Sequence, residues 1–320
     1  MDTSLARPSH AAPAWHESFS NSLITGLAKT PKEIACKYFY DEAGSHLFER
    51  ICQLPEYYQT RTETALLFRH AAEIARLIGD DVEIVEFGAG SLRKVRILLD
   101  AVATIRAYTP LDISGDYLTD VVQILAANYP ALLLRPLIAD FTAPLDMAPL
   151  PGNPRRIGFF PGSTIGNFKP AAAVALLCRM RASLEGGGLL IGVDLAKDPA
   201  RLHAAYNDSA GVTAQFNKNL LVRANRELGA NFDSNAFAHY APYNTAEHRI
   251  EMYLVSLKRQ HVTICGKHFD FAADEPVHTE DSHKYTIESF REMAVHAGFS
   301  PRAVWTDEER LFSIHWLETR

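Results

Sequence analysis

The stretch Val85-Glu86-Phe87-Gly88-Ala89-Gly90-Ser91 decides the fold class of this chain. Its apolar residues up to Phe87 are typical of a buried strand, and its two glycines let the backbone bend and approach a ligand closely. A second apolar run ends in Pro110-Leu111-Asp112, which places an acidic side chain 24 residues after Gly88. Strand, glycine turn, helix and a second strand with a terminal acid together predict the first βαβ unit of a nucleotide-binding sheet.

The glycine turn also indicates which nucleotide is bound. A dinucleotide fingerprint needs a third glycine where this chain has Arg93, and no G-x-x-x-x-G-K-[ST] phosphate loop occurs. An adenosine ligand without phosphates fits what remains, and S-adenosylmethionine is the common one. Asp112 would accept hydrogen bonds from its ribose hydroxyls, and Lys94 would pair with its methionyl carboxylate. The alternative for Lys94 is a solvated lysine in the first helical turn.

Composition limits the remaining function classes. The 320 residues hold ample apolar content for a core, and the net charge of −6 comes from mixed acidic and basic residues, which argues against a nucleic-acid partner. The cysteines Cys36, Cys52, Cys178 and Cys265 lie far apart, which indicates a reducing compartment and neither structural zinc nor disulfides. With no signal sequence or membrane-length apolar run, we expect a soluble, cytoplasmic, metal-free protein without a membrane partner. Nothing in the sequence requires a dimer, so a monomer is expected.

Strand and helix patterns alternate from about residue 82 to 195, which predicts a parallel sheet with helices on both faces. The expected strands are Glu83–Phe87, Ala107–Ile113, Leu132–Ile138, Ile157–Phe160 and Gly188–Asp194. The expected helices are Lys94–Val102, Gly115–Asn128 and Ala171–Leu184.

The flanking regions break this alternation. After a disorder-prone start, the N-terminal region contains the helical patterns Ser18–Leu27, Leu47–Leu54 and, as one long helix, Arg61–Leu77. Further on, 197–232 is helical in pattern, 247–285 contains antiparallel strands, and the helix Ile287–Ala297 precedes the strands Arg302–Thr306 and Leu311–Leu317. A helix and a final hairpin are typical of a class I methyltransferase sheet, which is Rossmann-like and mostly parallel, with an antiparallel last hairpin strand.

This pattern predicts two domains. Residues 61–196 and 286–320 would form the S-adenosylmethionine-binding methyltransferase domain. Residues 1–60 and 197–285 would form a discontinuous substrate-binding domain, because a lobe inserted at the strand ends commonly supplies specificity.

Two further strand ends carry candidate ligand-binding residues. Asp140 and Phe141 follow the third strand, where a carboxylate can accept from the adenine amino group and an aromatic ring can pack on the base. The alternative for Asp140 is a cap or turn residue. Asn167 ends the loop Gly162-Ser163-Thr164-Ile165-Gly166-Asn167 after the fourth strand, and its amide can hold both an ammonium and a carboxylate. The alternative for Asn167 is a left-handed turn residue.

Several longer stretches carry a resemblance to one family. They are Lys37-Tyr38-Phe39-Tyr40-Asp41, Leu54-Pro55-Glu56-Tyr57-Tyr58-Gln59-Thr60-Arg61, Gly162-Ser163-Thr164-Ile165-Gly166-Asn167, Asp194-Leu195-Ala196-Lys197-Asp198, Ala205-Tyr206-Asn207-Asp208 and Arg249-Ile250-Glu251-Met252. Over roughly residues 25–320 the chain resembles the histidine Nα-methyltransferases of ergothioneine biosynthesis, which convert L-histidine to its betaine, hercynine. The glycine turn is a looser match, with Gly88-Ala89-Gly90-Ser91 where many relatives have Gly-Ser-Gly-Thr. Alanine is small, so we expect no loss of cofactor binding.

The resemblance implies a role for each matching residue. The residues that would bind S-adenosylmethionine are Gly88, Lys94, Asp112, Asp140 and Phe141, with Gly162 near the path of the methyl group. The residues that would bind the amino acid are Asn167 and Tyr206 at its α-amino and carboxylate ends, Tyr57, Glu280 and Ser282 at its imidazole, and Tyr40 and Met252 along the cavity. Taken singly, each tyrosine could equally be a core aromatic, and Glu280 a solvated strand residue.

The implied reaction is trimethylation of the α-amino group, which requires a neutral amine. No dedicated strong base stands in the motifs, so the proton would leave to water or through Tyr40, which with Asn167 forms the predicted catalytic pair. The face of Tyr40 would also attract the methylated cation. One alternative is another aromatic amino acid such as tryptophan, against which Glu280 and Met252 argue. The other is a non-catalytic S-adenosylmethionine-binding protein, against which the amino-acid-binding residues argue.

Overall fold

The computed structural model describes residues 14–90, 92–184 and 186–319. The predicted disordered N-terminus falls largely outside these ranges, as does Ser91 of the glycine turn. The chain divides into two compact units, each built from three segments. Unit 1 comprises Met1–Asp41, Ala214–Tyr240 and Met252–Glu280; unit 2 comprises Glu42–Thr213, Ala241–Glu251 and Asp281–Arg320.

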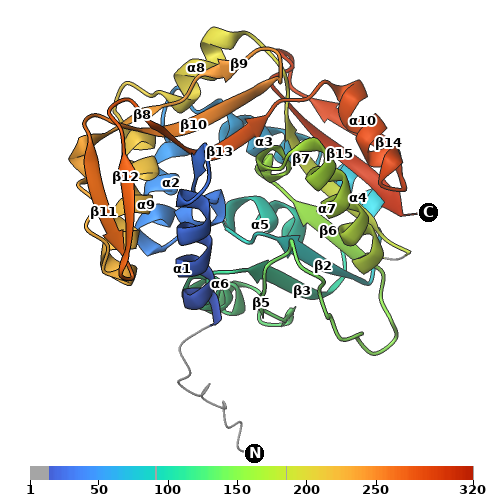
Figure 1. The fold of residues 1–320 in the computed structure, drawn as a ribbon. Helices are drawn as coiled ribbons and strands as arrows, with labels where there is room; N and C mark the ends of the chain where they lie inside the picture. The colour runs from blue at the N-terminus through green and yellow to red at the C-terminus, as the bar shows by residue number, and fades with distance from the viewer. Residues whose placement is uncertain (1–13, 91, 185, 320) are drawn as a thin grey trace, which may run out of the picture. The chain divides into compact units, whose positions relative to one another are not determined.

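Unit 2 is built on an eight-stranded sheet in the order β14-β15-β7-β6-β2-β3-β4, with β5 also pairing with β3 (Figure 1). Its strands are β2 (Val82–Phe87), β3 (Ile105–Asp112), β4 (Leu133–Leu134), β5 (Leu137–Ile138), β6 (Arg156–Phe160), β7 (Gly188–Asp194), β14 (Phe299–Thr306) and β15 (Phe312–Thr319). The strands β2 to β7 pair in parallel, whereas β15 is antiparallel to both β7 and β14. This order confirms the class I methyltransferase sheet with its antiparallel last hairpin.

Helices cover both faces of this sheet because its strands are apolar on both sides. On one face, Ile84 and Leu190 pack with residues of α3, α4, α5 and α6. On the other face, Val85 and Ile191 pack with residues of α7 and α10. The helices of unit 2 are α2 (Glu42–Ile51), α3 (Tyr58–Arg69), α4 (Ala71–Ile78), α5 (Leu92–Ala101), α6 (Gly115–Asn128), α7 (Pro170–Ser183), α8 (Pro199–Tyr206) and α10 (Ile287–His296).

Two elements that the sequence predicts as continuous are each divided in two in the structure. The single helix Arg61–Leu77 is two helices, α3 and α4, which meet at the non-helical residue His70. Tertiary contacts explain the break: the His70 ring lies 6.0 Å from that of Trp305, whose indole N–H donates to Glu73 at 2.9 Å. The single strand Leu132–Ile138 is the pair β4 and β5, because Pro136 between them has no N–H to donate to the ladder.

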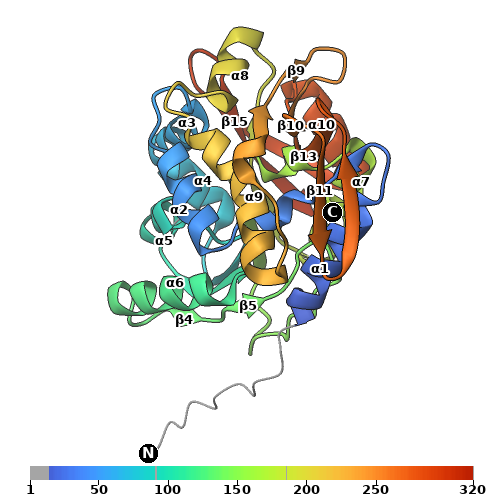
Figure 2. The same cartoon turned by 60° about the vertical axis from the view of Figure 1, so that its left-hand side comes forward.

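Unit 1 contains most of a second sheet and a separate two-stranded hairpin. Its elements are α1 (Ala14–Leu27), β1 (Lys32–Glu33), the 3-10 helix Cys36–Phe39, the 3-10 helix Ser234–Ala236, β8 (Phe237–Tyr240), the hairpin β11 (Gln260–Ile264) and β12 (Lys267–Phe271), and most of α9 (Val212–Leu228), β10 (Arg249–Ser256) and β13 (Pro276–His283). The strand order is β1-β13-β10-β8, and the two-residue β9 (Tyr243–Asn244) pairs with the start of β10. Helix α9 lies against these strands (Figure 2), where the Asn217 amide donates to the Tyr253 carbonyl on β10 at 3.0 Å.

The two units differ from the predicted domains at their boundaries. Segments 42–60, 197–213, 241–251 and 281–285 belong to unit 2, although the sequence pattern grouped them with the substrate-binding domain. Side-chain contacts within unit 2 explain this placement: the Tyr58 hydroxyl donates to Asp194 at the end of β7, and Ser209 donates to Glu56. The helical pattern of 197–232 likewise resolves into α8 and α9.

Candidate active site

The carboxyl ends of the parallel strands of unit 2 bring the predicted cofactor residues to one edge of the sheet. Gly88 follows β2, Asp112 ends β3, Asp140 follows β5, and Gly162 follows β6. Asp194 ends β7 at the same edge. All six residues predicted to bind S-adenosylmethionine therefore belong to a single structural unit.

The glycine turn lies directly beside Phe141. Gly88 has a positive φ of 74°, and a Cβ atom built on it would lie 3.5 Å from the Phe141 ring. The same ring contacts Phe160 and Phe168 with centroids 5.5 and 6.3 Å away. The glycine backbone and the aromatic ring of Phe141 thus stand side by side at the edge where the parallel strands end.

The two predicted acids of this edge have different surroundings. Burial raises the pKa of Asp112 to about 6, although the backbone N–H groups of Ser114 and Ile113 work in the opposite direction. The Ser114 N–H donates to Asp112 at 2.8 Å. The Asp140 carboxylate accepts from the backbone N–H of Thr142 at 2.9 Å and from the Thr142 hydroxyl at 2.5 Å. These are the hydrogen bonds expected of an aspartate that stabilises a turn. Asp140 therefore shapes the loop in this structure, and its contact with adenine stays a prediction.

Lys94 is not a solvated lysine. Its ammonium pairs with the carboxylate of Glu63 at 2.5 Å, and both side chains are buried. The Glu63 carboxylate also accepts the backbone N–H of Gly162, at 2.9 and 3.0 Å from its two oxygens. Glu63 on α3 thus connects Lys94 on α5 to the backbone of Gly162, which follows β6.

Gly192 on β7 makes room for the Glu63 carboxylate. A Cβ atom at Gly192 would lie 2.1 Å from the nearer carboxylate oxygen, far inside contact distance. We therefore expect Gly192→Ala to lower the free energy of unfolding by roughly 1–3 kcal/mol, because Glu63 must move away from Lys94 and Gly162. Urea denaturation of the purified variant measures this.

The matched control for that substitution is Gly90→Ala, since a Cβ atom at Gly90 meets nothing within 4 Å and Gly90 is outside the positive-φ region. It should stay within about 0.5 kcal/mol of the wild type. Equal stability of the two alanine variants would contradict the placement of Glu63.

A second glutamate, Glu86, is buried on β2. Burial raises the pKa of Glu86 on β2 to about 8, even though the Tyr108 hydroxyl donates to its carboxyl group and Lys94 lies nearby. Burial thus favours the neutral form of the Glu86 carboxyl group near pH 7.

Three predicted substrate residues meet in a second cluster of unit 2. The hydroxyl groups of Tyr206 and Ser282 lie 2.8 Å apart, and the Tyr57 ring lies 6.5 Å from that of Tyr206. Beneath them, the ammonium of Lys284 donates to Tyr206 at 3.0 Å and to Ser282 at 2.7 Å. Lys284 therefore connects residues that the sequence places 76 positions apart.

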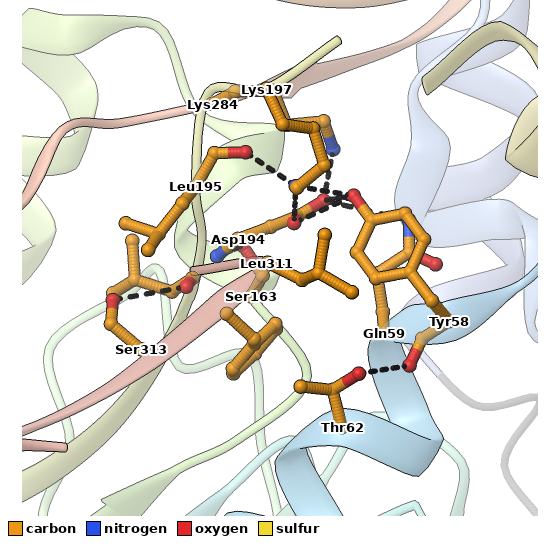
Figure 3. Close-up of polar contacts among 12 residues, drawn as sticks. Tyr58, Gln59, Thr62, Ser163, Asp194, Leu195, Lys197, Lys284, Leu311 and Ser313 are labelled. Carbon is orange, nitrogen blue, oxygen red and sulfur yellow. Dashed lines mark hydrogen bonds and ion pairs between the residues drawn. The ribbon is translucent and has the colours of Figure 1, made fainter. Parts of the chain in front are cut away.

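Asp194 neutralises this buried lysine (Figure 3). Its carboxylate lies 2.9 Å from the Lys284 ammonium and 2.5 Å from that of Lys197, and it accepts the Tyr58 hydroxyl at 2.8 Å. Burial opposes its ionised form, but the two lysines outweigh burial and hold the pKa of Asp194 below its ordinary range. Burial likewise opposes the Lys284 ammonium, yet Asp194 and Tyr206 raise the pKa of Lys284; the pKa of Lys197 falls to about 8, chiefly through burial.

The loop that carries Asn167 packs against this cluster. Residues Thr164–Asn167 form a 3-10 helix whose preceding residue, Ser163, is left-handed with φ 57°. Asn167 itself is not left-handed, so the turn alternative for it is wrong. A Cβ atom at Gly166 would lie 2.8 Å from the His283 carbonyl oxygen. Only glycine thus lets the loop approach the end of β13, between Ser282 and Lys284.

The remaining predicted substrate residues lie in unit 1. Tyr40 follows the 3-10 helix Cys36–Phe39, with its ring 5.7 Å from Phe216 on α9. Met252 on β10 is buried and its carbonyl accepts the Thr279 hydroxyl at 3.1 Å, next to Glu280 on β13. Glu280 is only 9% exposed, which excludes the solvated alternative. Glu280 and Ser282 stand two residues apart on β13, so their side chains leave the same face of the strand.

Within the described ranges, no three His, Cys, Asp or Glu side chains are grouped so as to hold a metal ion. In the same ranges, no helix has both the length and the apolar character that crossing a membrane requires.

A family model described as a histidine-specific methyltransferase, SAM-dependent, matches residues 19–319. The chain belongs to this family. It is 41% identical over 303 residues to the histidine N-alpha-methyltransferase of Mycolicibacterium smegmatis, covering 93% of this chain and 94% of that protein. It is 31% identical to ergothioneine biosynthesis protein 1 of Neurospora crassa, over 86% of this chain but 32% of that protein. A solved structure of a possible exported protein from Bordetella parapertussis shares the fold, with 12% identity, TM-score 0.52 and coverage of 93% and 86%.

Three buried charged residues of this member of the histidine-specific methyltransferase family, Glu63, Asp194 and Lys284, are not among the residues predicted from the sequence, although they contact residues that are. A signal for Glu63 was present, because glycine inside a strand, here Gly192, often marks the close approach of another group. Asp194 ends a strand as Asp112 does, so it could have been found by the same rule. Lys284 gave no such signal.

Proposed function

We propose that the chain catalyses the S-adenosylmethionine-dependent trimethylation of the α-amino group of L-histidine to hercynine, a step of ergothioneine biosynthesis. The observation that carries this proposal is the match of nearly the whole chain to a histidine N-alpha-methyltransferase at 41% identity. The cluster of Tyr57, Tyr206 and Ser282 supports it, because a protein that only bound the cofactor would need no polar cradle for an amino acid.

The residues at the carboxyl edge of the sheet fit S-adenosylmethionine. Gly88 and the Phe141 ring lie together at the strand ends, where the ring would pack on a base, and Asp112 supplies a partly buried carboxylate for two ribose hydroxyls. Lys94 and Glu63 form a buried pair of opposite charges, which suits a methionyl end that carries both a carboxylate and an ammonium. Gly162, bound to Glu63, completes this set. When bound, the cofactor supplies a methyl group on a sulfonium centre.

The chain itself would position and orient the amine. Asn167 offers a carbonyl acceptor to the amino group, and the Tyr206 hydroxyl would donate to the carboxylate. Such placement contributes most of the rate when the attacking atom is held in line and water is excluded. The reacting amine must be neutral, and its proton would leave to water or through Tyr40. The ring of Tyr40 would attract the methylated cation, by about 1 kcal/mol or more when desolvated.

In this proposal Glu280 and Ser282 recognise the imidazole, Tyr57 assists them, and Met252 lines the cavity. The segments of unit 1 would supply part of the substrate specificity. The protein would act on small molecules as a cytoplasmic monomer without a metal ion. Light scattering of the purified protein tests the monomer, and elemental analysis tests the absence of metal.

The direct test incubates purified protein with S-adenosylmethionine and one amino acid at a time, and analyses the product by mass spectrometry. L-histidine should give a product that carries three additional methyl groups and is heavier by three CH2 units, and L-tryptophan and L-phenylalanine should be far poorer substrates. Preference for tryptophan would overturn the substrate assignment, and absence of any methylated product would favour the non-catalytic alternative.

Glu280→Ala tests the reading of the imidazole. It should lower kcat/KM for L-histidine by roughly 10- to 100-fold and change that for L-tryptophan far less, because a site built to hydrogen-bond a polar ring rejects others through its own unpaired groups. Competition between the two amino acids at equal cofactor measures the change. Full retention of the histidine preference would refute this role. Ser282 is a poorer target, since it also accepts from Lys284.

A further inference from the structure

Ser163 has a backbone conformation that serine rarely adopts. It lies in the left-handed region with φ 57° and ψ 27°, directly after Gly162, whose φ is 83°. Glycine would adopt this conformation without steric cost, whereas the Cβ atom of a serine is crowded there. A side chain at such a position persists only where its surroundings stabilise it. The surroundings of the buried Ser163 hydroxyl group supply that stabilisation.

The Ser163 hydroxyl group is bonded to the end of β7 (Figure 3). The backbone N–H of Asp194 donates to the Ser163 hydroxyl oxygen at 2.9 Å, and the direction of this bond is fixed because an N–H can only donate. The neighbouring strand β6 pairs with β7 only as far as Ile191. The Asp194 N–H thus lies beyond the parallel pairing, where Ser163 accepts from it. Asp194 is fully buried, so its N–H would be costly to leave without this acceptor.

Ser163 also begins the turn that carries Asn167. The Gly166 N–H donates to the Ser163 carbonyl at 2.8 Å, which closes the 3-10 helix Thr164–Asn167 into a single turn. A Cβ atom at Gly166 would lie 3.6 Å from the Ser163 hydroxyl oxygen, so the turn folds back over that oxygen. Asn167 follows Gly166 directly. A change in the orientation of Ser163 is therefore passed to Asn167 through one short turn.

We propose that Ser163 is a positioning residue for Asn167, because its hydroxyl group anchors the start of the 3-10 turn to the end of β7. This inference rests on the proposed function, in which the Asn167 amide binds the α-amino group of the amino acid. Ser163 acts through the backbone and does not itself touch the substrate. The Gly162 N–H has a separate anchor, the Glu63 carboxylate beside Lys94. Loss of the Ser163 anchor should therefore weaken substrate binding and spare cofactor binding.

The test compares L-histidine with imidazolepropionate, which keeps the imidazole and the carboxylate but lacks the α-amino group. Calorimetric titration with S-adenosylhomocysteine present gives both affinities without turnover, and wild-type protein should prefer L-histidine. Ser163→Ala keeps the Cβ atom and removes the acceptor. It should weaken L-histidine binding roughly tenfold and change the affinities for imidazolepropionate and S-adenosylhomocysteine by less than about twofold. Equal weakening of L-histidine and imidazolepropionate would show a general structural role and would overturn the proposal.

Ser313→Ala is the matched control. The Ser313 hydroxyl donates to the Val193 carbonyl at 3.2 Å, one residue before Asp194, and Ser313 is also buried. Its other described contact is His315, so this substitution removes a buried hydroxyl group from the same strand end without touching the loop of Asn167. The ratio of the L-histidine and imidazolepropionate affinities should stay at the wild-type value, even where the melting temperature falls. A fall in this ratio equal to that of the Ser163 variant would overturn the proposal.

Ser163→Gly keeps the test decisive if Ser163→Ala does not fold. Glycine relieves the crowding of the left-handed backbone but also lacks the hydroxyl group, so the affinity ratio should fall as it does with alanine. A glycine variant with the wild-type ratio would show that the backbone conformation alone orients Asn167, and it would overturn the proposal. A wild-type protein that binds L-histidine no better than imidazolepropionate would instead contradict the role of Asn167 in the proposed function, so the two failures are distinguishable.

Discussion

Asp112→Asn is expected to weaken S-adenosylmethionine binding roughly 100-fold and at the same time to stabilise the ligand-free protein at neutral pH. The binding loss follows because a carboxylate accepts two charge-assisted hydrogen bonds from ribose hydroxyls, whereas an amide has one neutral acceptor oxygen. Its oxygen can still accept the Ser114 N–H, so the loop keeps its local bond. Calorimetric titration of the variant with the cofactor measures the loss.

The stability gain follows from the direction of the pKa shift. Burial raises the pKa of Asp112 from 3.8 to about 6, so ionisation of this group opposes folding. Its contribution to stability is complete below roughly pH 4 and is lost as the pH rises through about 6. Asparagine carries no such penalty, and we expect a gain on the order of 1 kcal/mol at neutral pH that disappears in acid. Unchanged cofactor affinity would refute the nucleotide-site assignment; a stability gain that persists in acid would refute its electrostatic cause.

The sequence could predict the sheet and its ligand edge because both follow from short-range patterns. Each parallel strand is a continuous apolar run, and the residue after it lies at the same edge as the residues after its neighbours. Gly88, Asp112 and Phe141 were found in this way, and the structure places the first and last of them in contact distance.

The errors and omissions come from contacts between segments far apart in the sequence. The helix break at His70 depends on Trp305, which lies more than 230 positions later, and no local pattern contains that information. Glu63 and Lys284 are charged residues whose burial depends on partners in other elements. A charged residue read alone is assigned to solvent, because unpaired burial is rare. Only the folded arrangement supplies the partner that reverses this assignment.

Among single substitutions at the edge of the sheet where the predicted cofactor residues lie, those that break the buried ion pair of Glu63 and Lys94 should lower stability most. Glu63→Gln leaves the Lys94 ammonium buried without its counter-charge, and Lys94→Met leaves the Glu63 carboxylate buried without its own. Each substitution should lower the free energy of unfolding by about 3–5 kcal/mol. The double variant should cost far less than the sum, since neither charge then remains buried alone. Urea denaturation of the four proteins gives the coupling energy, which we expect to be about 2 kcal/mol or more.

The exposed pair of Arg302 and Glu318 is the matched control for this cycle. Its atoms lie 2.7 Å apart, about as close as those of the buried pair, but the two side chains are 61% and 39% exposed. The coupling energy from Arg302→Met and Glu318→Gln should therefore stay below about 1 kcal/mol. If the buried pair couples no more strongly than this exposed pair, Glu63 does not hold Lys94 in place. Glu63→Gln should then leave cofactor affinity unchanged, whereas the arrangement around Gly162 predicts a clear loss, because the carboxylate also fixes the backbone N–H of that turn.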